Sequence, residues 1–224
     1  GDGLTDIVAT DANRRVYVIF GSTNASNLTV GASSVDGTGT RGFAFTIDDP
    51  DNSAASSATE FYGQQTRATG IGDFNGDGLD DFIVGYYAGD RYSLTDTGKS
   101  YVVYGRVSGT SFTASSMSAS DGFRILGETT NDWSGYGVSG GEDINGDGYT
   151  DLLISAPKAA AGGTSNGKSY VIFGGYSSYS PTVFDSSSGD AVGGTGSDTL
   201  GDATANRSNQ FIGGAGNDTI TGNG

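Results

Sequence analysis

The chain of 224 residues contains no cysteine and no histidine. These absences exclude disulfide bonds, thiolate or imidazole metal sites and Ser-His-Asp triads, and they remove the commonest general base. Proline occurs three times, no apolar run reaches the roughly 18 residues of a membrane helix, and no signal peptide opens the chain. We therefore expect no membrane insertion, and any metal site must be built from oxygen ligands.

Positive charge is also scarce, with 11 Lys and Arg against 26 Asp and Glu and a net charge of −15. A nucleic acid duplex or an anionic membrane surface repels such a chain, so we expect neither as a partner. Excess carboxylate is tolerated best where cations neutralise it, and hard cations such as Ca²⁺ prefer oxygen ligands. Glycine, by contrast, occurs 40 times, which indicates many tight turns.

The sequence contains internal repeats. Three Asp/Gly-rich segments align, namely "GDGLTDIVATDA" (1–12), "DFNGDGLDDFIVGYY" (73–87) and "DINGDGYTDLLISAP" (143–157). Further strand-like stretches lie at 14–22, 99–107 and 168–176, at 41–48 and 121–128, and at 61–72 and 133–141. Four short strands per unit of about 70 residues are what a β-propeller blade requires, and a lone blade cannot bury its faces. We predict an all-β fold with about two and a half propeller blades in residues 1–184.

Two enzyme-like motifs are rejected. The residues Gly162, Gly167, Lys168 and Ser169 satisfy G-x-x-x-x-G-K-[ST], the phosphate-binding loop. That loop must open a helix, whereas Lys168 leads into an expected strand, and the preceding unit has Ser93 where the first glycine should stand. Ser139 in "GVSGG" fits the G-x-S-x-G elbow, which needs a following helix and a histidine base. We expect no catalysis by either segment.

Oxygen-bearing side chains stand at positions 1, 3, 5 and 9 of two loops with the pattern D-x-N-x-D-G-x-x-D. They are Asp73, Asn75, Asp77 and Asp81 in the first loop and Asp143, Asn145, Asp147 and Asp151 in the second. Alternate residues of a tight loop project inward, so these oxygens can converge on one ion. A backbone carbonyl at position 7, from Leu79 or Tyr149, would complete the shell. A truncated copy remains at Asp2, Leu4 and Asp6.

We predict Ca²⁺ in these loops, because Mg²⁺ prefers to keep its waters. Gly78 and Gly148 at position 6 supply the sharp turn. An EF-hand is excluded, since position 12 is Val84 or Ile154 instead of Glu. The alternative is an Asp/Asn/Gly-rich turn that binds nothing.

The run "GYGVSGGEDINGDGYTDLLISAP" (135–157) resembles the FG-GAP repeat of integrin α-subunit β-propellers and their bacterial relatives. The resemblance covers residues 1 to about 184 and implies calcium in the loop between two strands of a blade. That family usually closes seven blades, so the ring must be completed by residues outside this sequence or by another chain. Because the chain starts with Gly-Asp-Gly and lacks an initiator Met, we expect an interior segment of a longer protein.

Residues 185–224 follow a different pattern. The stretches "GGTGSDTLG" (193–201) and "GGAGNDTIT" (213–221) match G-G-x-G-x-D-x-U-x and resemble the RTX repeat of secreted bacterial toxins, proteases and adhesins. The resemblance implies the start of a calcium-dependent parallel β-roll, with Asp198 and Asp218 as carboxylate ligands and Leu200 and Ile220 in its core. The alternative is a flexible Gly/Ser/Asp linker.

Together the resemblances imply a calcium-binding, non-catalytic module of a large secreted or cell-surface bacterial protein, exported by a type I system. We expect a role in adhesion or in extracellular filament or matrix structure, with a protein or polysaccharide ligand or copies of the chain itself as partners. The alternative is an accessory propeller of a secreted RTX hydrolase whose catalytic domain lies outside this sequence. The 23 Tyr and Phe residues mostly occupy strand positions, where they serve core packing or, alternatively, a sugar-binding platform.

Overall fold

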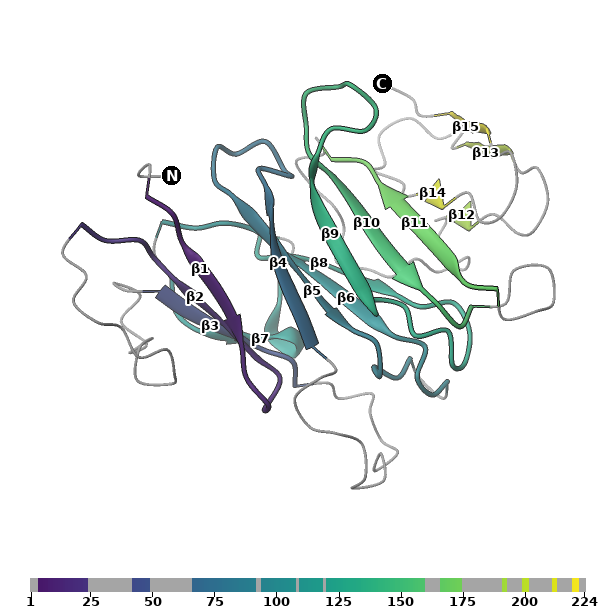
Figure 1. The fold of residues 1–224 in the computed structure, drawn as a ribbon, viewed down its shortest axis with the longest axis horizontal. Helices are drawn as coiled ribbons and strands as arrows, with labels where there is room; N and C mark the ends of the chain where they lie inside the picture. Colours follow the sequence, from purple (N-terminus) through teal and green to yellow (C-terminus); the bar gives the residue numbers. More distant parts are fainter. Residues whose placement is uncertain are drawn as a thin grey trace.

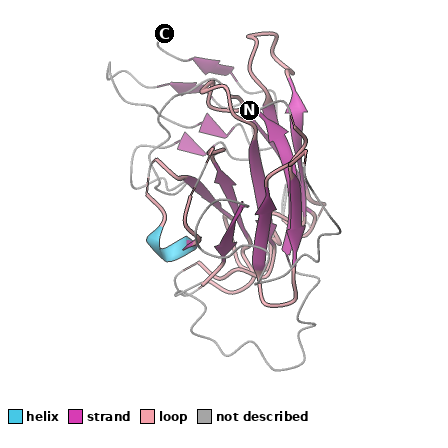
Figure 2. Cartoon of the chain, turned by 90° about the vertical axis from the view of Figure 1, so that its left-hand side faces the viewer, coloured by secondary structure: helices cyan, strands magenta, loops and turns pink. Residues whose placement is uncertain are grey.

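The computed structural model describes residues 4–23, 42–48, 66–91, 94–107, 109–118, 120–159 and 166–174, and the backbone of four short strands between 191 and 221. The described chain is built from β-strands joined by loops, with a single three-residue 3₁₀ helix, η1 (Ala114–Ser116) (Figures 1 and 2). None of the described residues forms a helix long and apolar enough to cross a membrane. The predicted all-β class is confirmed.

Three sheets lie side by side (Figure 1). Sheet 1 contains β1 (Ile7–Thr10), β2 (Arg15–Ile19) and β3 (Gly42–Thr46); sheet 2 contains β4 (Thr66–Gly72), β5 (Asp81–Tyr86), β6 (Lys99–Val103) and β8 (Gly122–Leu126); sheet 3 contains β9 (Gly137–Glu142), β10 (Asp151–Ala156) and β11 (Lys168–Ile172). All pairs of neighbouring strands named here are antiparallel. Each of these strands lies within a stretch that the sequence predicts as a strand, except that β9 extends one residue further, to Glu142. The four-stranded order β4-β5-β6-β8 is that of a propeller blade.

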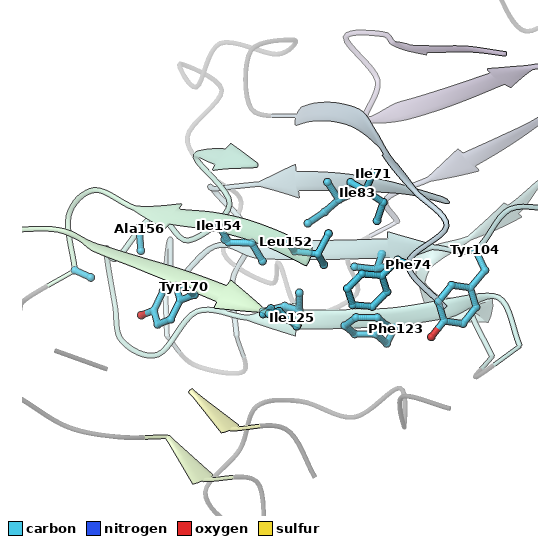
Figure 3. Packing of buried hydrophobic residues seen from close by; sticks show 13 residues of the cluster. Ile71, Phe74, Ile83, Tyr104, Phe123, Ile125, Leu152, Ile154, Ala156 and Tyr170 are labelled. Atoms are coloured by element: carbon cyan, nitrogen blue, oxygen red, sulfur yellow. The ribbon is translucent and has the colours of Figure 1, made fainter. Parts of the chain in front are cut away.

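The alternation of side chains along β5 explains why the sheets stack. Phe82 and Val84 point into a core shared with sheet 1, while Ile83 between them points into the core shared with sheet 3. In the second core, Leu152 and Ile154 of β10 face sheet 2 (Figure 3). Sheet 2 is therefore buried on both faces, as a blade between two others must be.

Two apolar side chains on the far face of sheet 3 are partly exposed. Leu153 and Val171 are 44% and 39% exposed. In the repeat alignment they correspond to Ile83 and Val102 of sheet 2, which are fully buried against sheet 3. The same two positions are thus core in one repeat and surface in the next, which leaves room for a further blade.

One strand is absent from the sequence prediction. β7 (Phe112–Thr113) belongs to the connection between β6 and β8, yet it pairs in parallel with β3 of sheet 1. Ser115, just beyond β7, donates its backbone N–H and its hydroxyl to Asp48, which follows β3. Arg106 lies over the rings of Phe43 and Phe112, and its guanidinium forms an ion pair with Asp121 at 3.2 Å. The connection therefore ties sheet 2 to sheet 1.

The C-terminal strands form a different arrangement. They are β12 (Ala191–Val192), β13 (Thr199–Gly201), β14 (Phe211–Ile212) and β15 (Thr219–Thr221). β12 pairs with β14 and β13 with β15, in both cases in parallel and between residues 20 positions apart, such as Leu200 and Ile220. The four described strands thus pair in parallel with a period of 20 residues, just before and at the end of each glycine-rich stretch.

A matched pair of leucines tests this division between core and surface. Leu152→Ala leaves a cavity between sheets 2 and 3 and should lower the free energy of unfolding by about 2–5 kcal/mol. Leu153→Ala, one residue away on the exposed face, should lower it by less than about 1 kcal/mol. Urea denaturation of the two variants measures both values. Equal losses would contradict the assignment of the two faces.

Candidate metal centre

The two complete Asp-rich loops join β4 to β5 and β9 to β10, and they lie at the same end of sheets 2 and 3 (Figure 1). In the first loop, Asp73 Oδ1 accepts the N–H groups of Gly76 and Asp77 at 2.8 and 3.0 Å, and its Oδ2 accepts that of Gly78 at 2.9 Å. The position-1 carboxylate therefore holds the loop wrapped around itself.

The second loop repeats this geometry. Asp143 Oδ1 accepts from Gly146 and Asp147 at 2.6 and 3.1 Å, and Oδ2 accepts from Gly148 at 2.8 Å. The N–H of Gly148 and the others outweigh burial and lower the pKa of Asp143. Gly148 has φ +93°, a left-handed conformation that favours glycine. Two loops 70 residues apart in sequence thus adopt one structure.

Positions 3, 5 and 7 complete the inner side of each loop. In the first, Asn75 Nδ2 donates to Asp77 Oδ2 at 3.0 Å, and Leu79 N donates to Asp77 Oδ1 at 2.8 Å. In the second, Asn145 Nδ2 donates to Asp147 Oδ2 at 2.9 Å and Tyr149 N to Asp147 Oδ1 at 2.9 Å. The Asn and Asp side chains therefore bond to each other in both loops.

The position-9 aspartates have a role that the sequence analysis missed. Asp81 is 1% exposed, and its Oδ2 accepts the N–H groups of Phe74 and Asn75, at positions 2 and 3 of the loop. Its Oδ1 accepts the N–H of Gly105, two residues beyond β6, at 2.7 Å. The carboxylate thus joins the start of the loop to the end of a neighbouring strand.

This Asp–Gly contact occurs in all three repeats. Asp151 accepts from Gly174 at 3.0 Å, and Asp6 accepts from Gly21 at 2.8 Å. We call these three bonds, including that of Asp81 with Gly105, the Asp–Gly clasps. The signal in the sequence is a glycine two residues after the second strand of every unit, in "FGS", "YGR" and "FGG".

Close packing explains why the clasp uses glycine. A Cβ on Gly105 would lie 2.5 Å from the carbonyl oxygen of Asp80, and one on Gly174 would lie 2.2 Å from that of Thr150. Both distances are shorter than any real Cβ contact, and the atoms met are backbone atoms that cannot turn away. The strand end must therefore approach position 8 of the loop without a side chain.

Burial has an electrostatic consequence at Asp81. Loss of hydration raises its pKa to about 7, although the N–H groups of Gly105, Phe74 and Asn75 act in the opposite direction. The charge of Asp77 contributes to the rise. A carboxylate in this state is stabilised by a proton or by a nearby cation.

The donor set suits a hard cation, since it consists of carboxylate, amide and carbonyl oxygens. However, among the described residues no three Asp, Glu, His or Cys side chains are grouped closely enough to hold a metal ion. The position-9 carboxylates accept backbone N–H groups instead. In this conformation an ion would depend on the aspartates at positions 1 and 5, the amide at position 3 and backbone carbonyls. Ligation by Asp6, Asp81 and Asp151 stays a prediction.

Of the remaining predicted ligands, the structure describes only Leu4. Leu4 is described and 39% exposed, near the clasp of Asp6 with Gly21. Asp2, Asp198 and Asp218 lie outside the described residues. Ion binding by the truncated loop and by the RTX-like stretches therefore stays a prediction from the sequence.

The structure also places the two enzyme-like motifs. Lys168 begins strand β11, and its Nζ forms an ion pair with Glu128 at 2.6 Å, so it is engaged between sheets 2 and 3. Ser139 lies within strand β9, paired with Leu153 of β10. Both predicted strand positions are confirmed, and neither residue precedes a helix; Gly162 lies outside the described residues.

The sheets and the loops between their strands define the class: an all-β assembly of propeller-type blades. Comparison with known families then identifies two FG-GAP repeats, at residues 66–103 and 134–172. The matches run from β4 to the end of β6 and from just before β9 to the end of β11, so each includes one complete Asp-rich loop. No curated protein matched the chain significantly.

The clasp predicts a difference between two glycines. Gly105→Ala should lower the free energy of unfolding by at least about 2 kcal/mol, because it forces backbone atoms apart and disrupts a hydrogen bond to a buried carboxylate. A Cβ at Gly78 would have no atom within 4 Å, but the backbone there has φ +88°. Gly78→Ala should therefore lower the free energy of unfolding only by the backbone strain, about 1 kcal/mol. Thermal unfolding in the presence of a chelator separates these effects from ion binding. A larger loss for Gly78→Ala would argue against the clasp.

Proposed function

We propose that the chain is a calcium-binding, non-catalytic propeller module of a large secreted or cell-surface bacterial protein. The observation that carries the proposal is the pair of loops with the same ligand pattern and the same internal hydrogen bonds. A role in adhesion or in extracellular filament or matrix structure agrees with an acidic chain that lacks cysteine. Calcium then takes the stabilising role that disulfides have in many extracellular proteins.

The residues proposed to hold the ion are those at positions 1, 3 and 5 and the carbonyl at position 7. They are Asp73, Asn75, Asp77 and Leu79 in one loop and Asp143, Asn145, Asp147 and Tyr149 in the other. When bound, the ion supplies positive charge to a loop whose carboxylates otherwise repel each other. The glycines at positions 4 and 6 allow the turn, and both oxygens of the position-1 carboxylate accept N–H groups of the loop.

The Asp–Gly clasps link this charge to the rest of the blade. Asp81 contacts positions 2 and 3 of the loop on one side and the end of β6 on the other. Neutralising the loop makes the buried carboxylate easier to keep ionised, and an ionised carboxylate accepts stronger hydrogen bonds. Ion binding at the loop should therefore stabilise the strand ends as well.

The exposed face of sheet 3 supports a larger assembly. Leu153 and Val171 repeat two positions that sheet 2 buries under its neighbour. We infer that further blades, from polypeptide outside this sequence or from another chain, complete the ring.

Calcium binding is tested by titration calorimetry and thermal unfolding of the chain. A site that binds only the native state adds about 2.7 kcal/mol of stability at a hundredfold excess over Kd. Asp77→Ala and Asp147→Ala should each abolish binding of one ion and reduce this gain. Asp80→Ala removes an exposed carboxylate of the same loop at a non-ligand position and should leave the ion count unchanged. A melting temperature that changes neither with Ca²⁺ nor with chelator would contradict the proposal.

We further propose that residues 191–221 form the start of a calcium-dependent β-roll. The parallel pairing of β12 with β14 and of β13 with β15 supports it, because stacked turns of a roll pair in this way. In such a roll Asp198 and Asp218 would be ligands in equivalent turns.

Within the full chain, Asp218→Ala should lower the number of bound Ca²⁺ ions, whereas Asp202→Ala, outside the nonapeptide pattern, should not. The expected cause is loss of a carboxylate that coordinates the ion between neighbouring turns. Ion counts from calorimetry compare the two variants. Equal counts in both would favour the linker interpretation of this stretch.

A further inference from the structure

A cluster of aromatic rings lies at the end of the sheets opposite the Asp-rich loops. Tyr87 directly follows β5, whose other end adjoins the first loop, while Trp133 and Tyr136 directly precede β9. Two basic residues join them: Arg67 near the start of β4 and Lys158 just after β10. We call these five residues the aromatic–cation patch.

The three rings form a compact group. Tyr87 lies 5.2 Å from Trp133 and 5.3 Å from Tyr136, measured between ring centroids. The rings of Trp133 and Tyr136 are almost parallel, at 6.1 Å and 13°. Tyr136 is 39% exposed, in contrast to the strand tyrosines that fill the cores. Tyr87 also packs against the core shared by sheets 1 and 2, whereas Tyr136 extends the group to the surface.

Backbone strain sets Trp133 apart. Its φ is +58°, a left-handed conformation that is rare for a bulky side chain. Hydrogen bonds of its N–H to Asp96 O and of its carbonyl to Tyr136 N, both 3.2 Å, fix this turn. Strained residues of this kind concentrate at binding sites, where surrounding contacts pay for the conformation.

The two cations are exposed and held by the rings. Lys158 Nζ lies 3.1 Å from the centroid of the Trp133 ring, and Arg67 Cζ lies 5.2 Å from that of Tyr136. Within the described part of the chain neither forms an ion pair, although the chain has more than twice as many acidic as basic residues. Ring faces stabilise these charges without neutralising them.

The acidic groups beside the patch are already engaged. Asp132, next to Trp133 in sequence, is 3% exposed and accepts the N–H and the hydroxyl of Thr129, both at 2.7 Å. Glu128 accepts Lys168 Nζ and the hydroxyl of Tyr170, each at 2.6 Å. Lys158 and Arg67 are thus left with capacity for carboxylates that come from outside.

We propose that the aromatic–cation patch binds a polysaccharide that carries spaced carboxylates, such as a uronic acid-containing chain. Sugar C–H groups pack on the exposed part of Tyr136, and the ammonium and guanidinium groups donate to the carboxylates. A chain with one charge per disaccharide is much less repelled by the acidic protein than a nucleic acid duplex is. At physiological salt the Asp-rich loops at the opposite end are screened, since the Debye length is about 8 Å.

Trp133 offers a direct measurement, because it is the only tryptophan of the chain. A hyaluronan octasaccharide, which alternates glucuronate with N-acetylglucosamine, should change the tryptophan fluorescence of the full chain in a saturable manner. The same octasaccharide with its carboxylates reduced to alcohols should bind at least fivefold more weakly. Titrations with calcium and with chelator separate this binding from the calcium proposal, because the patch contains none of the proposed ligands.

Matched variants locate the binding. Lys158→Gln and Arg67→Gln should each weaken the octasaccharide at least fivefold without changing the melting temperature. Arg15→Gln removes an exposed charge outside the patch and should leave the affinity unchanged. The proposal is overturned by no saturable change in fluorescence or heat, by equal affinity for the reduced sugar, by equal loss in Arg15→Gln, or by a response to an acidic peptide but not to the sugar.

Discussion

The buried carboxylate at position 9 of each loop is the contact on which the local architecture depends. Each loop of eight residues consists mostly of Asp, Asn and Gly. Its second position is an apolar anchor only in the first loop, where Phe74 is fully buried in the core between sheets 2 and 3, whereas Ile144 in the second loop is 59% exposed. Asp81 adds an anchor through three backbone N–H groups from two separate segments. Its burial raises its pKa, so the anchor is itself strained in electrostatic terms, and a cation on the loop would relieve that strain.

Sheet stacking follows from the same strands. Directly after Asp81, β5 alternates Phe82, Ile83 and Val84 between two cores. After Asp151, β10 places Leu152 and Ile154 in the core shared with sheet 2 and Leu153 on the exposed face. The start of β5 therefore both anchors the loop and packs the core. The loop pattern and the apolar alternation of the following strand therefore recur together in the two complete repeats.

Repetition made much of the fold predictable from the sequence. The strands of the three sheets, the loops between β4 and β5 and between β9 and β10, and the strand positions of Lys168 and Ser139 all follow from aligned apolar runs and turn residues. β7 did not, because Phe112 and Thr113 form a two-residue strand whose partner lies in another repeat. The sequence did not predict the Asp–Gly clasps, because the ligand pattern assigned position 9 to metal binding alone. Only the fold brings Gly105 beside Asp81. The aromatic–cation patch joins residues from sheets 2 and 3 that no local pattern connects.

The parallel pairing at the C-terminal end has a consequence for how this region can change in length. Leu200 pairs with Ile220, and each residue of β12 or β13 has its partner 20 positions later. Duplication or deletion of a whole 20-residue unit preserves every pairing, because each new turn stacks on a copy of itself. A change in length by whole 20-residue units therefore keeps the backbone register of this pairing, whereas a change by one residue within a strand shifts it.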